Sequence, residues 1–225
     1  MKDVITKYER VPAEIIEAYK SVGESASINE ALPDKDGALD SKIKPIWTDC
    51  KTCGAALTVQ CWPGDNLMLH KAISMLSPND VLVVVNGGYD EAGGMFGEIM
   101  ASCVVAKKGA GLVIEGACRD TVAIRKMGLP VFATNVSIKP TTKALPGKIN
   151  HPVIIGGVSV EPGDLIFGDN DGIVVVPKAL AAEVLEKVQK REKNEAAMLE
   201  KIARGELITF DAFKKAYDSL GLSED

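Results

Sequence analysis

Short apolar runs alternate with amphipathic segments through the central part of the chain. The run "VLVVVNGG" is continuously apolar and ends in glycines, which is typical of a strand buried on both faces. The segment "FGEIMASCVVAKKG" has helical spacing and stops at a glycine. In order, we expect a strand at 81–88, a helix at 96–109, a strand at 111–116, a helix at 119–128 and a strand at 129–136. Strand–helix–strand units at this spacing predict right-handed crossovers and a parallel sheet.

The flanking regions follow other patterns. Before the sheet region we expect helices at 12–22 and 25–34, strands at 43–47 and 54–62, and a helix at 63–76. After residue 150, short apolar stretches broken by Gly-Gly, Pro-Gly-Asp and Asp-Asn-Asp-Gly predict antiparallel β structure, with "GDNDG" as a hairpin turn. A long charged helix is expected at 177–204 and a last helix at 209–220.

Two of these helices carry more detailed expectations. Asp65 is the expected N-cap of the helix in 63–76. In the helix at 96–109, the apolar spacing predicts one shared face, made of Ile99, Met100, Cys103 and Val104.

The pattern divides the chain into a single α/β domain at 1–176 and a C-terminal helical arm at 177–225. The arm has too few apolar positions to form a domain of its own. We therefore expect it to pack on a neighbouring subunit, and the protein to be a homo-oligomer.

Composition narrows the classes of function. The chain has 225 residues and a net charge of −5, without a polybasic block, so we expect no nucleic-acid partner. The first sixteen residues carry charges throughout, and the apolar runs are of strand length, so we expect neither a secretion signal nor a membrane partner. A cytoplasmic protein is the expectation.

The cysteines and histidines give weaker signals. Cys50 and Cys53 form a Cys-x-x-Cys pair, with Cys61 and His70 downstream, but a second clear ligand pair for zinc is lacking. We favour reduced cysteines over a zinc site, and a packed or interface histidine at position 70. Cys103 and Cys118 are expected to be small buried residues.

Two neighbouring strands of the expected sheet end in sequence suited to ligand binding. The first leads into "NGGYDEAGGMFGEIM", a glycine-rich loop before a helix, and the second ends in "GACRD". Ligands of parallel α/β proteins bind at the carboxyl ends of strands. If the two strands are adjacent, Arg119, Asp120 and the N–H groups around Gly97–Met100 converge on one crevice. Alternatively, Asp120 caps the following helix and Arg119 lies on the surface, and the residues alone leave both readings open.

Such a crevice would suit a small 2-oxo acid. Glycines let the backbone approach a ligand closely, and N–H groups at a helix N-terminus favour an anion. The guanidinium of Arg119 matches a carboxylate through two parallel hydrogen bonds. Asp120 could hold Mg²⁺ or Mn²⁺, directly or through water, because these ions prefer hard oxygen ligands.

Several segments resemble, in the same order, the RraA-like family. They are "PGDNLMLHKAI", "VLVVVNGGYDEAGGMFGE", "GLVIEGACRD", "GLPVFA", "GDNDGIVVVP" and "ARGEL". They look most like its aldolase branch, the 4-hydroxy-4-methyl-2-oxoglutarate / 4-carboxy-4-hydroxy-2-oxoadipate aldolases. The resemblance runs from about residue 25 to the C-terminus, and its most specific element is the glycine loop followed downstream by Arg-Asp.

This resemblance implies a fold and an active site. The fold would be a swivelling-domain-like, layered β/β/α core, and the activity that of a class II, divalent-metal-dependent pyruvate aldolase. Asp120 would anchor the metal and Arg119 would contact pyruvate. The loop whose amides hold the pyruvate carboxylate matches Gly97, Glu98, Ile99 and Met100, with Glu98 at its usual acidic position.

The resemblance also implies that the site is shared between subunits. Glu30 and Glu195 match acidic positions that family members donate from an adjacent subunit, through water, to the metal. A trimer or hexamer is therefore expected. Ala123 departs from the pattern, because some relatives carry an acidic residue there.

The implied reaction is cleavage of a 4-hydroxy-2-oxo diacid to pyruvate and a second oxo acid, with oxaloacetate decarboxylation as a side activity. The alternatives are a non-catalytic regulator of ribonuclease activity and a dedicated oxaloacetate decarboxylase. The resemblance suggests that the regulator branch lacks the C-terminal arm, so the arm favours the enzyme. Thr142 and Lys143 lie in a polar loop that could reach substrate, and the sequence assigns them no role.

Overall fold

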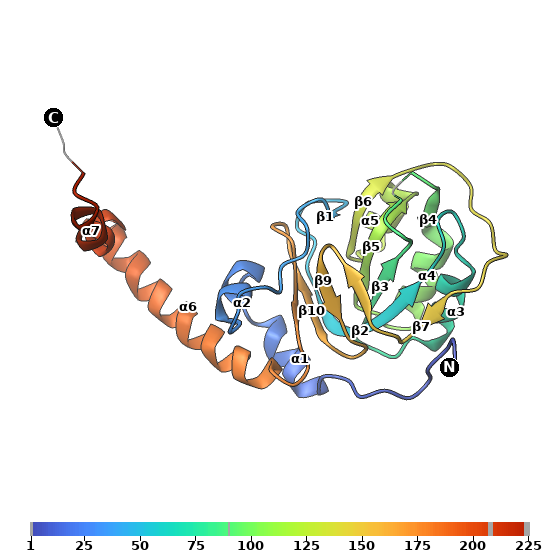
Figure 1. Ribbon diagram of the computed structural model, residues 1–225, viewed down its shortest axis with the longest axis horizontal. Helices are drawn as coiled ribbons and strands as arrows, with labels where there is room; N and C mark the ends of the chain where they lie inside the picture. Colours follow the sequence, from blue (N-terminus) through green and yellow to red (C-terminus); the bar gives the residue numbers. More distant parts are fainter. Residues whose placement is uncertain (1, 90, 207–208, 223–225) are drawn as a thin grey trace.

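The computed structural model describes residues 2–89, 91–206 and 209–222. Most of its strands form one sheet with the order β1-β6-β5-β3-β2-β10-β11, and two more form a separate hairpin (Figure 1). The expected α/β class is confirmed, and the sheet combines parallel and antiparallel pairs.

The centre of the sheet is parallel, as the strand–helix–strand pattern predicts. Its four strands are β2 (Thr52–Gln60), β3 (Asp80–Val85), β5 (Gly111–Cys118) and β6 (Val131–Val136). Each pairs in parallel with the next in the spatial order β2-β3-β5-β6. All residues of β3 are buried, which agrees with its continuous apolar run.

Antiparallel strands complete the structure on both sides. They are β1 (Lys44–Pro45), β7 (Lys148–Ile149), β8 (Val153–Ile155), β9 (Val158–Val160), β10 (Leu165–Gly168) and β11 (Ile173–Val176). The segment "GDNDG" forms the turn between β10 and β11, as expected. The Asp169 carboxylate organises this turn, because it accepts hydrogen bonds from the N–H of Asp171 and from both the N–H and the hydroxyl of Ser25.

Alternate residues of the parallel strands face two different layers. Leu82 and Val84 of β3 pack into a cluster with helices α3 (Leu67–Met75), α4 (Glu98–Ala106) and α5 (Thr121–Lys126). Val81 and Val83 pack into a second cluster with residues of β8 to β11. These clusters make the core a β/β/α sandwich, which confirms the expected layering.

The N-terminal helices and the first half of the last long helix form a third cluster on the outer side of β10 and β11. These helices are α1 (Ala13–Lys20), α2 (Ser25–Ala31) and α6 (Ala181–Ala203). The buried residues of α6 end at Val188, and α7 (Thr209–Ser219) buries none. The second half of α6 therefore projects from the body of the molecule, with α7 at its far end (Figure 1).

Two local expectations were wrong, and one strand was missed. Met100 and Val104 of α4 are buried together with Ala101, whereas Ile99 and Cys103 are exposed. The N-cap of α3 is Asn66 rather than Asp65. A short strand that the pattern did not predict, β4 (Gly94–Phe96), precedes α4 and pairs with β5.

Across the described residues, no helix combines the length and the apolar character that a membrane crossing needs.

Candidate active site

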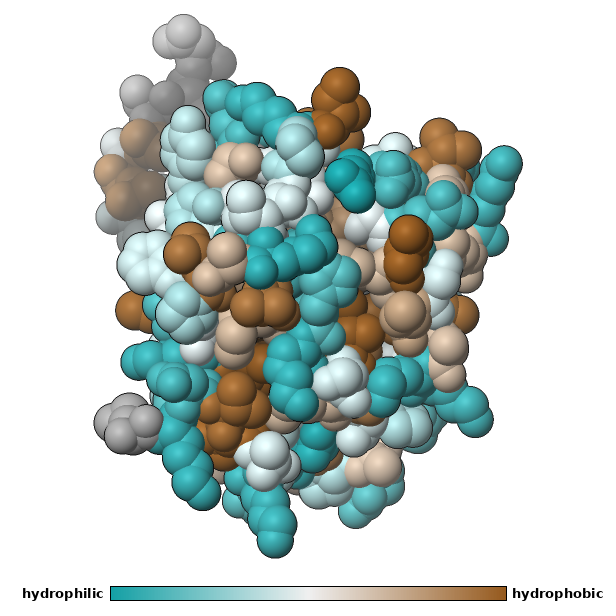
Figure 2. Space-filling view, turned by 90° about the vertical axis from the view of Figure 1, so that its right-hand side faces the viewer, coloured by the Kyte–Doolittle hydropathy of each residue, from teal (hydrophilic) through white to brown (hydrophobic). Residues whose placement is uncertain are grey.

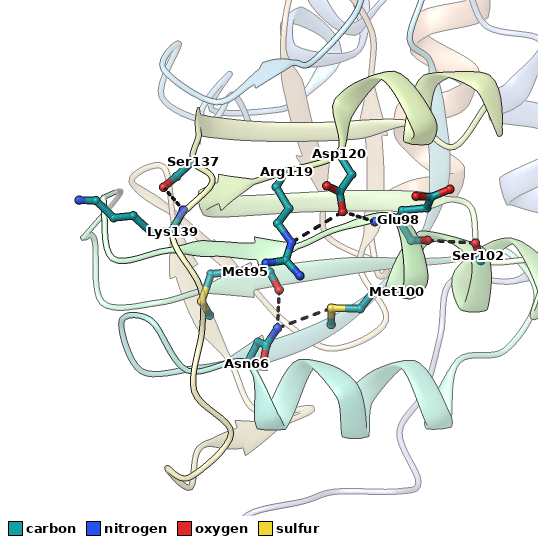
Figure 3. A network of polar contacts seen from close by, with 9 residues as sticks. All are labelled: Asn66, Met95, Glu98, Met100, Ser102, Arg119, Asp120, Ser137 and Lys139. Carbon is teal, nitrogen blue, oxygen red and sulfur yellow. Dashed lines mark hydrogen bonds and ion pairs between the residues drawn. The ribbon is translucent and has the colours of Figure 1, made fainter.

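Arg119 and Asp120 lie where β5 ends, beside the start of α4 (Figure 3). The pairing of β4 with β5 brings these segments together, because the Arg119 N–H donates a 2.8 Å hydrogen bond to the Phe96 carbonyl. β3 and β5 are adjacent and parallel, so the condition for a shared crevice is met.

Asp120 does not cap its own helix. Its side chain makes no capping hydrogen bond to α5, and its Oδ2 instead accepts a 3.0 Å hydrogen bond from the Glu98 N–H at the start of α4. The residue has a φ of 59°, a left-handed conformation in which a non-glycine residue is strained. This conformation turns the carboxylate toward α4, and the side chain remains 43% exposed.

Arg119 lies next to this carboxylate without closing on it. Its Nε is 3.7 Å from Asp120 Oδ2, which is an ion pair at long range, and its side chain is also 43% exposed. The outer N–H groups of the guanidinium are therefore available to a carboxylate ligand.

Gly97 makes the close approach possible. A Cβ at this position would lie 2.6 Å from Asp120 Oδ2 and 3.1 Å from Arg119 Nε. Any side chain here would push the charged pair away from the start of α4.

The first turn of α4 presents amides next to the pair. The Ala101 N–H donates to the Gly97 carbonyl, so the N–H groups of Ile99 and Met100 precede the first intrahelical hydrogen bond. Amides in this position attract an anion, and the helix dipole adds to the attraction.

These elements enclose a cavity of about 280 Å³. Its lining residues are Asn66, His70, Gly94, Met95, Gly97, Glu98, Ile99, Met100, Arg119, Asp120, Thr141 and Lys143. The structure thus brings together all the residues predicted for pyruvate binding and adds His70 and Lys143 to them. Figure 2 shows the face of the molecule that lies on the right in Figure 1, where hydrophobic residues interrupt a largely hydrophilic surface.

Asn66 is a residue that sequence reasoning missed. It is only 4% exposed, and its Nδ2 donates to the Met95 carbonyl at 2.8 Å and to Met100 Sδ at 3.7 Å (Figure 3). Its Oδ1 has no hydrogen-bond partner among the described residues. Asn66 therefore joins the start of α3 to Met95 and Met100 on either side of Gly97. It lies within the resembling segment "PGDNLMLHKAI", but the sequence assigned it no role.

Asp65 fixes the loop that carries Lys143. Its Oδ1 accepts from the Leu67 N–H, and its Oδ2 accepts from the Thr142 hydroxyl at 2.7 Å and from the Ala144 N–H at 2.6 Å. Burial alone would raise the pKa of this carboxyl, but these hydrogen bonds outweigh it and lower the pKa below its ordinary value. Thr142 thus binds Asp65, while Lys143 reaches the cavity.

His70 is not a packed core histidine, and the other expected environment, a subunit interface, stays a prediction. Its side chain is exposed on α3 and lines the cavity. Partial burial lowers the pKa of His70 below its ordinary value, and the positive charge of Lys143 lowers it further. Both effects favour the neutral form of the imidazole.

Glu30 and Glu195 lie elsewhere in the chain. They flank an open hollow between α2 and α6, where Arg191 contacts both. Their predicted supply to the site of an adjacent subunit stays a prediction.

The donor set fits a hard divalent cation better than zinc. Asp120 offers a half-exposed carboxylate, and Mg²⁺ is commonly held by one or two carboxylates while it keeps several waters. Glu98 is a second carboxylate on the same cavity.

Burial raises the pKa of the Cys50 thiol to about 11 and that of the Cys61 thiol to about 12, so both stay protonated. Within the described residues, no three His, Cys, Asp or Glu side chains cluster around a common point.

Comparisons with known proteins show which sequences and folds this chain is similar to. A protein of Halalkalibacterium halodurans named "Putative 4-hydroxy-4-methyl-2-oxoglutarate aldolase" is 35% identical over 197 residues, which cover 87% of this chain and 86% of that protein. The structure of RraAS2 from Streptomyces coelicolor, titled an unusual member of the RNase ES inhibitor RraA family, matches with a TM-score of 0.75 and 27% identity. That match covers 85% of this chain and all of the other.

A second solved structure, the RNA-processing inhibitor RraA from Thermus thermophilis, matches with a TM-score of 0.63 and 26% identity. It covers 69% of this chain and 93% of the other. A family model described as "RraA-like: Aldolase/RraA" matches residues 17–175, and this chain therefore belongs to the RraA-like family.

Proposed function

We propose that this protein is a divalent-metal-dependent pyruvate aldolase. Its substrate would be a 4-hydroxy-2-oxo diacid such as 4-hydroxy-4-methyl-2-oxoglutarate or 4-carboxy-4-hydroxy-2-oxoadipate. The observation that carries the proposal is the pairing of Arg119 with an Asp120 carboxylate that does not cap its own helix, both beside the first turn of α4. A 2-oxo acid would use the Arg119 guanidinium, the Asp120 carboxylate and the first turn of α4 together.

The 2-oxo acid end of the substrate has a complete set of partners. Its carboxylate would lie between the Arg119 guanidinium and the N–H groups of Ile99 and Met100. These amides are held in place by the backbone, so little conformational entropy is lost when the anion binds. The 280 Å³ cavity is large enough for a small diacid and leaves little room for a nucleotide.

The distal carboxylate of the substrate would meet a second positive charge. Lys143 lines the same cavity as Arg119. Asp65 fixes the loop on either side of Lys143 through the Thr142 hydroxyl and the Ala144 N–H. A diacid would therefore be bound at both ends.

The Asp120 carboxylate would hold Mg²⁺ or Mn²⁺, which when bound supplies positive charge for the enolate oxygen that develops during cleavage. Arg119 would keep the carboxylate of the substrate oriented. A general base removes the proton of the C4 hydroxyl, the C4 carbonyl forms, and the C3–C4 bond breaks with its electron pair left on the pyruvate enolate. A proton then adds to C3 to give pyruvate. Glu98, on the cavity wall, is a candidate for moving these protons.

The same enolate forms when oxaloacetate loses carbon dioxide, so a decarboxylase activity follows from this site. A dedicated oxaloacetate decarboxylase would show its higher kcat/KM with oxaloacetate. The aldolase proposal requires the higher value with a 4-hydroxy-2-oxo diacid.

The proposal also covers the assembly. Glu30 and Glu195 of one copy would approach the Asp120 site of the next, in a trimer or hexamer. The projecting half of α6, with α7 at its end, would pack on the neighbouring copy, which fits its exposed apolar residues Leu199, Ile202, Phe210 and Phe213.

Metal add-back to chelated protein tests the activity. With Mg²⁺ or Mn²⁺ restored, we expect pyruvate release from 4-hydroxy-4-methyl-2-oxoglutarate, followed with a coupled lactate dehydrogenase assay. Asp120→Asn should abolish it, whereas Asp34→Asn, on an exposed residue, should not. Full activity without metal, or in Asp120→Asn, would overturn the proposal.

A non-catalytic regulator is the second candidate, because one similar solved structure is titled an RNA-processing inhibitor and another an unusual member of an RNase ES inhibitor family. Saturable inhibition of an RNase E-type endoribonuclease, with no release of pyruvate from any 4-hydroxy-2-oxo diacid, would favour this candidate.

A further inference from the structure

Arg191 lies between two glutamates from different helices. Its Nη2 is 2.6 Å from Glu30 Oε2 on α2, and its Nε is 2.7 Å from Glu195 Oε1 on α6. One guanidinium thus lies in ion-pair contact with two carboxylates that would otherwise repel each other.

Arg191 and its two glutamates are partly exposed at the surface. The side chains of Glu30, Arg191 and Glu195 are 48%, 39% and 41% exposed, and they line an open hollow of about 730 Å³ between α2 and α6. Each carboxylate accepts hydrogen bonds at several lone pairs, so contact with Arg191 leaves acceptor capacity free.

Stability alone is a weak reason for this arrangement. Ion pairs between side chains this exposed contribute little to folding, because water and salt screen them. The body of the molecule is already joined to α6 through Val184, Leu185 and Val188 in the third core cluster. Folding of the single chain therefore gains little from the three charges.

The Asp120 site has few carboxylates of its own, and Glu30 and Glu195 could supply two more. Only Glu98 and Asp120 supply carboxylates to the 280 Å³ cavity among its lining residues. Glu30 and Glu195 lie on the side of the sheet away from α4 and α5, so they cannot serve the cavity of their own chain (Figure 1).

We infer that Arg191 is a positioning residue for the shared active site. It holds Glu30 and Glu195 at a fixed separation, so that both carboxylates accept hydrogen bonds from the waters around the cation in the neighbouring copy. The inference rests on the proposed function, since it requires a metal at Asp120 and carboxylates from an adjacent subunit. Arg191 itself touches neither metal nor substrate.

Metal affinity is the direct readout. Mn²⁺ titration of the chelated oligomer, followed by electron paramagnetic resonance of the free ion, should show a dissociation constant at least about tenfold higher in Arg191→Gln, a loss of 1.4 kcal/mol. Arg191→Lys should fall between, because an ammonium keeps the positive charge but lacks the fixed planar geometry of a guanidinium. Arg204→Gln is the matched control, because Arg204 also pairs with two glutamates of the arm, Glu200 and Glu206.

Mixing tests whether the contribution crosses the subunit interface. Oligomers reassembled from Asp120→Asn and Arg191→Gln chains contain sites with an intact Asp120 from one copy and an intact Arg191 from the other. Those sites should bind Mn²⁺ with the affinity of the unmodified protein. The unmixed variants should not.

Unchanged Mn²⁺ affinity in Arg191→Gln would overturn the inference, as would the absence of recovery on mixing. Weakened affinity that accompanies dissociation of the oligomer in light scattering would also overturn it, because Arg191 would then only hold the interface together. If the unmodified protein binds Mn²⁺ but releases no pyruvate, the proposed function fails and the Mn²⁺ measurements on Arg191 still stand.

Discussion

At the scale of single residues, the site depends on how closely Gly97 lets two charged side chains approach α4. Asp120 adopts a left-handed backbone conformation and accepts the Glu98 N–H, which places its carboxylate across from Gly97. The cost of that conformation, on the order of 1 kcal/mol, is the kind of strain that proteins keep at functional sites.

Replacing Gly97 with alanine tests this geometry. The added Cβ would lie 2.6 Å from Asp120 Oδ2, so the carboxylate must shift, and a displacement of about 1 Å can lower a rate about 100-fold. We expect kcat/KM for aldol cleavage to fall by about that factor, with near-normal thermal stability. The control is Gly172→Ala, where an added Cβ meets no atom within 4 Å. Equal activity of the two variants would contradict the close-approach argument.

The residue scale also shows where sequence reasoning stops. The strand order made the meeting of the glycine loop with Arg119 and Asp120 predictable, because adjacent parallel strands end at the same edge. It did not reveal whether Asp120 caps α5 or bonds to α4, since that depends on one backbone dihedral. Asn66 was missed because its contacts with Met95 and Met100 are set by tertiary packing.

At the scale of elements, the α3 N-terminus and the loop before β7 act as one unit. Asp65 was predicted to cap α3, and it does accept the Leu67 N–H, but its second oxygen binds the loop that carries Lys143. The preference for aspartate near a helix N-terminus identified Asp65. Its hydrogen bonds to the loop that carries Lys143 could not be predicted from neighbouring positions, because that loop is far away in the sequence. In α4 the predicted apolar face was displaced, because Ala101 fills the core contact assigned to Cys103.

Asp65→Asn tests this unit. An amide in place of the carboxylate would lose charge-assisted hydrogen bonds to Thr142 and Ala144, so we expect about 2 kcal/mol less free energy of unfolding in urea. Because the folded state lowers the pKa of Asp65, its contribution is complete above the ordinary value of 3.8 and is lost as the pH falls through the lowered value. Asp36→Asn, on an exposed residue, serves as the control. Matching acid-unfolding curves for Asp65→Asn and the unmodified protein would contradict this role.

At the scale of the whole molecule, the fold separates two halves of one proposed site. The sandwich places Arg119 and Asp120 at the edge covered by α4, while α2 and α6 carry Glu30 and Glu195 on the opposite side. The arm that projects in Figure 1 has few contacts with its own chain beyond Val188. Hydropathy made the layers predictable, because they follow from apolar periodicity. The packing of the C-terminal arm on a neighbouring subunit stays a prediction. The distance between the two halves was not predictable, since it depends on how the layers stack.

The formation of pyruvate enolate at Asp120 is the central claim, and deuterium exchange into pyruvate tests it without knowledge of the second product. In D₂O, the protein with Mg²⁺ or Mn²⁺ should replace the methyl protons of pyruvate, seen as loss of the methyl signal in proton NMR. Chelation or Asp120→Asn should reduce exchange to the buffer rate. Exchange no faster than buffer with the metal-loaded protein, or undiminished exchange in Asp120→Asn, would contradict the account.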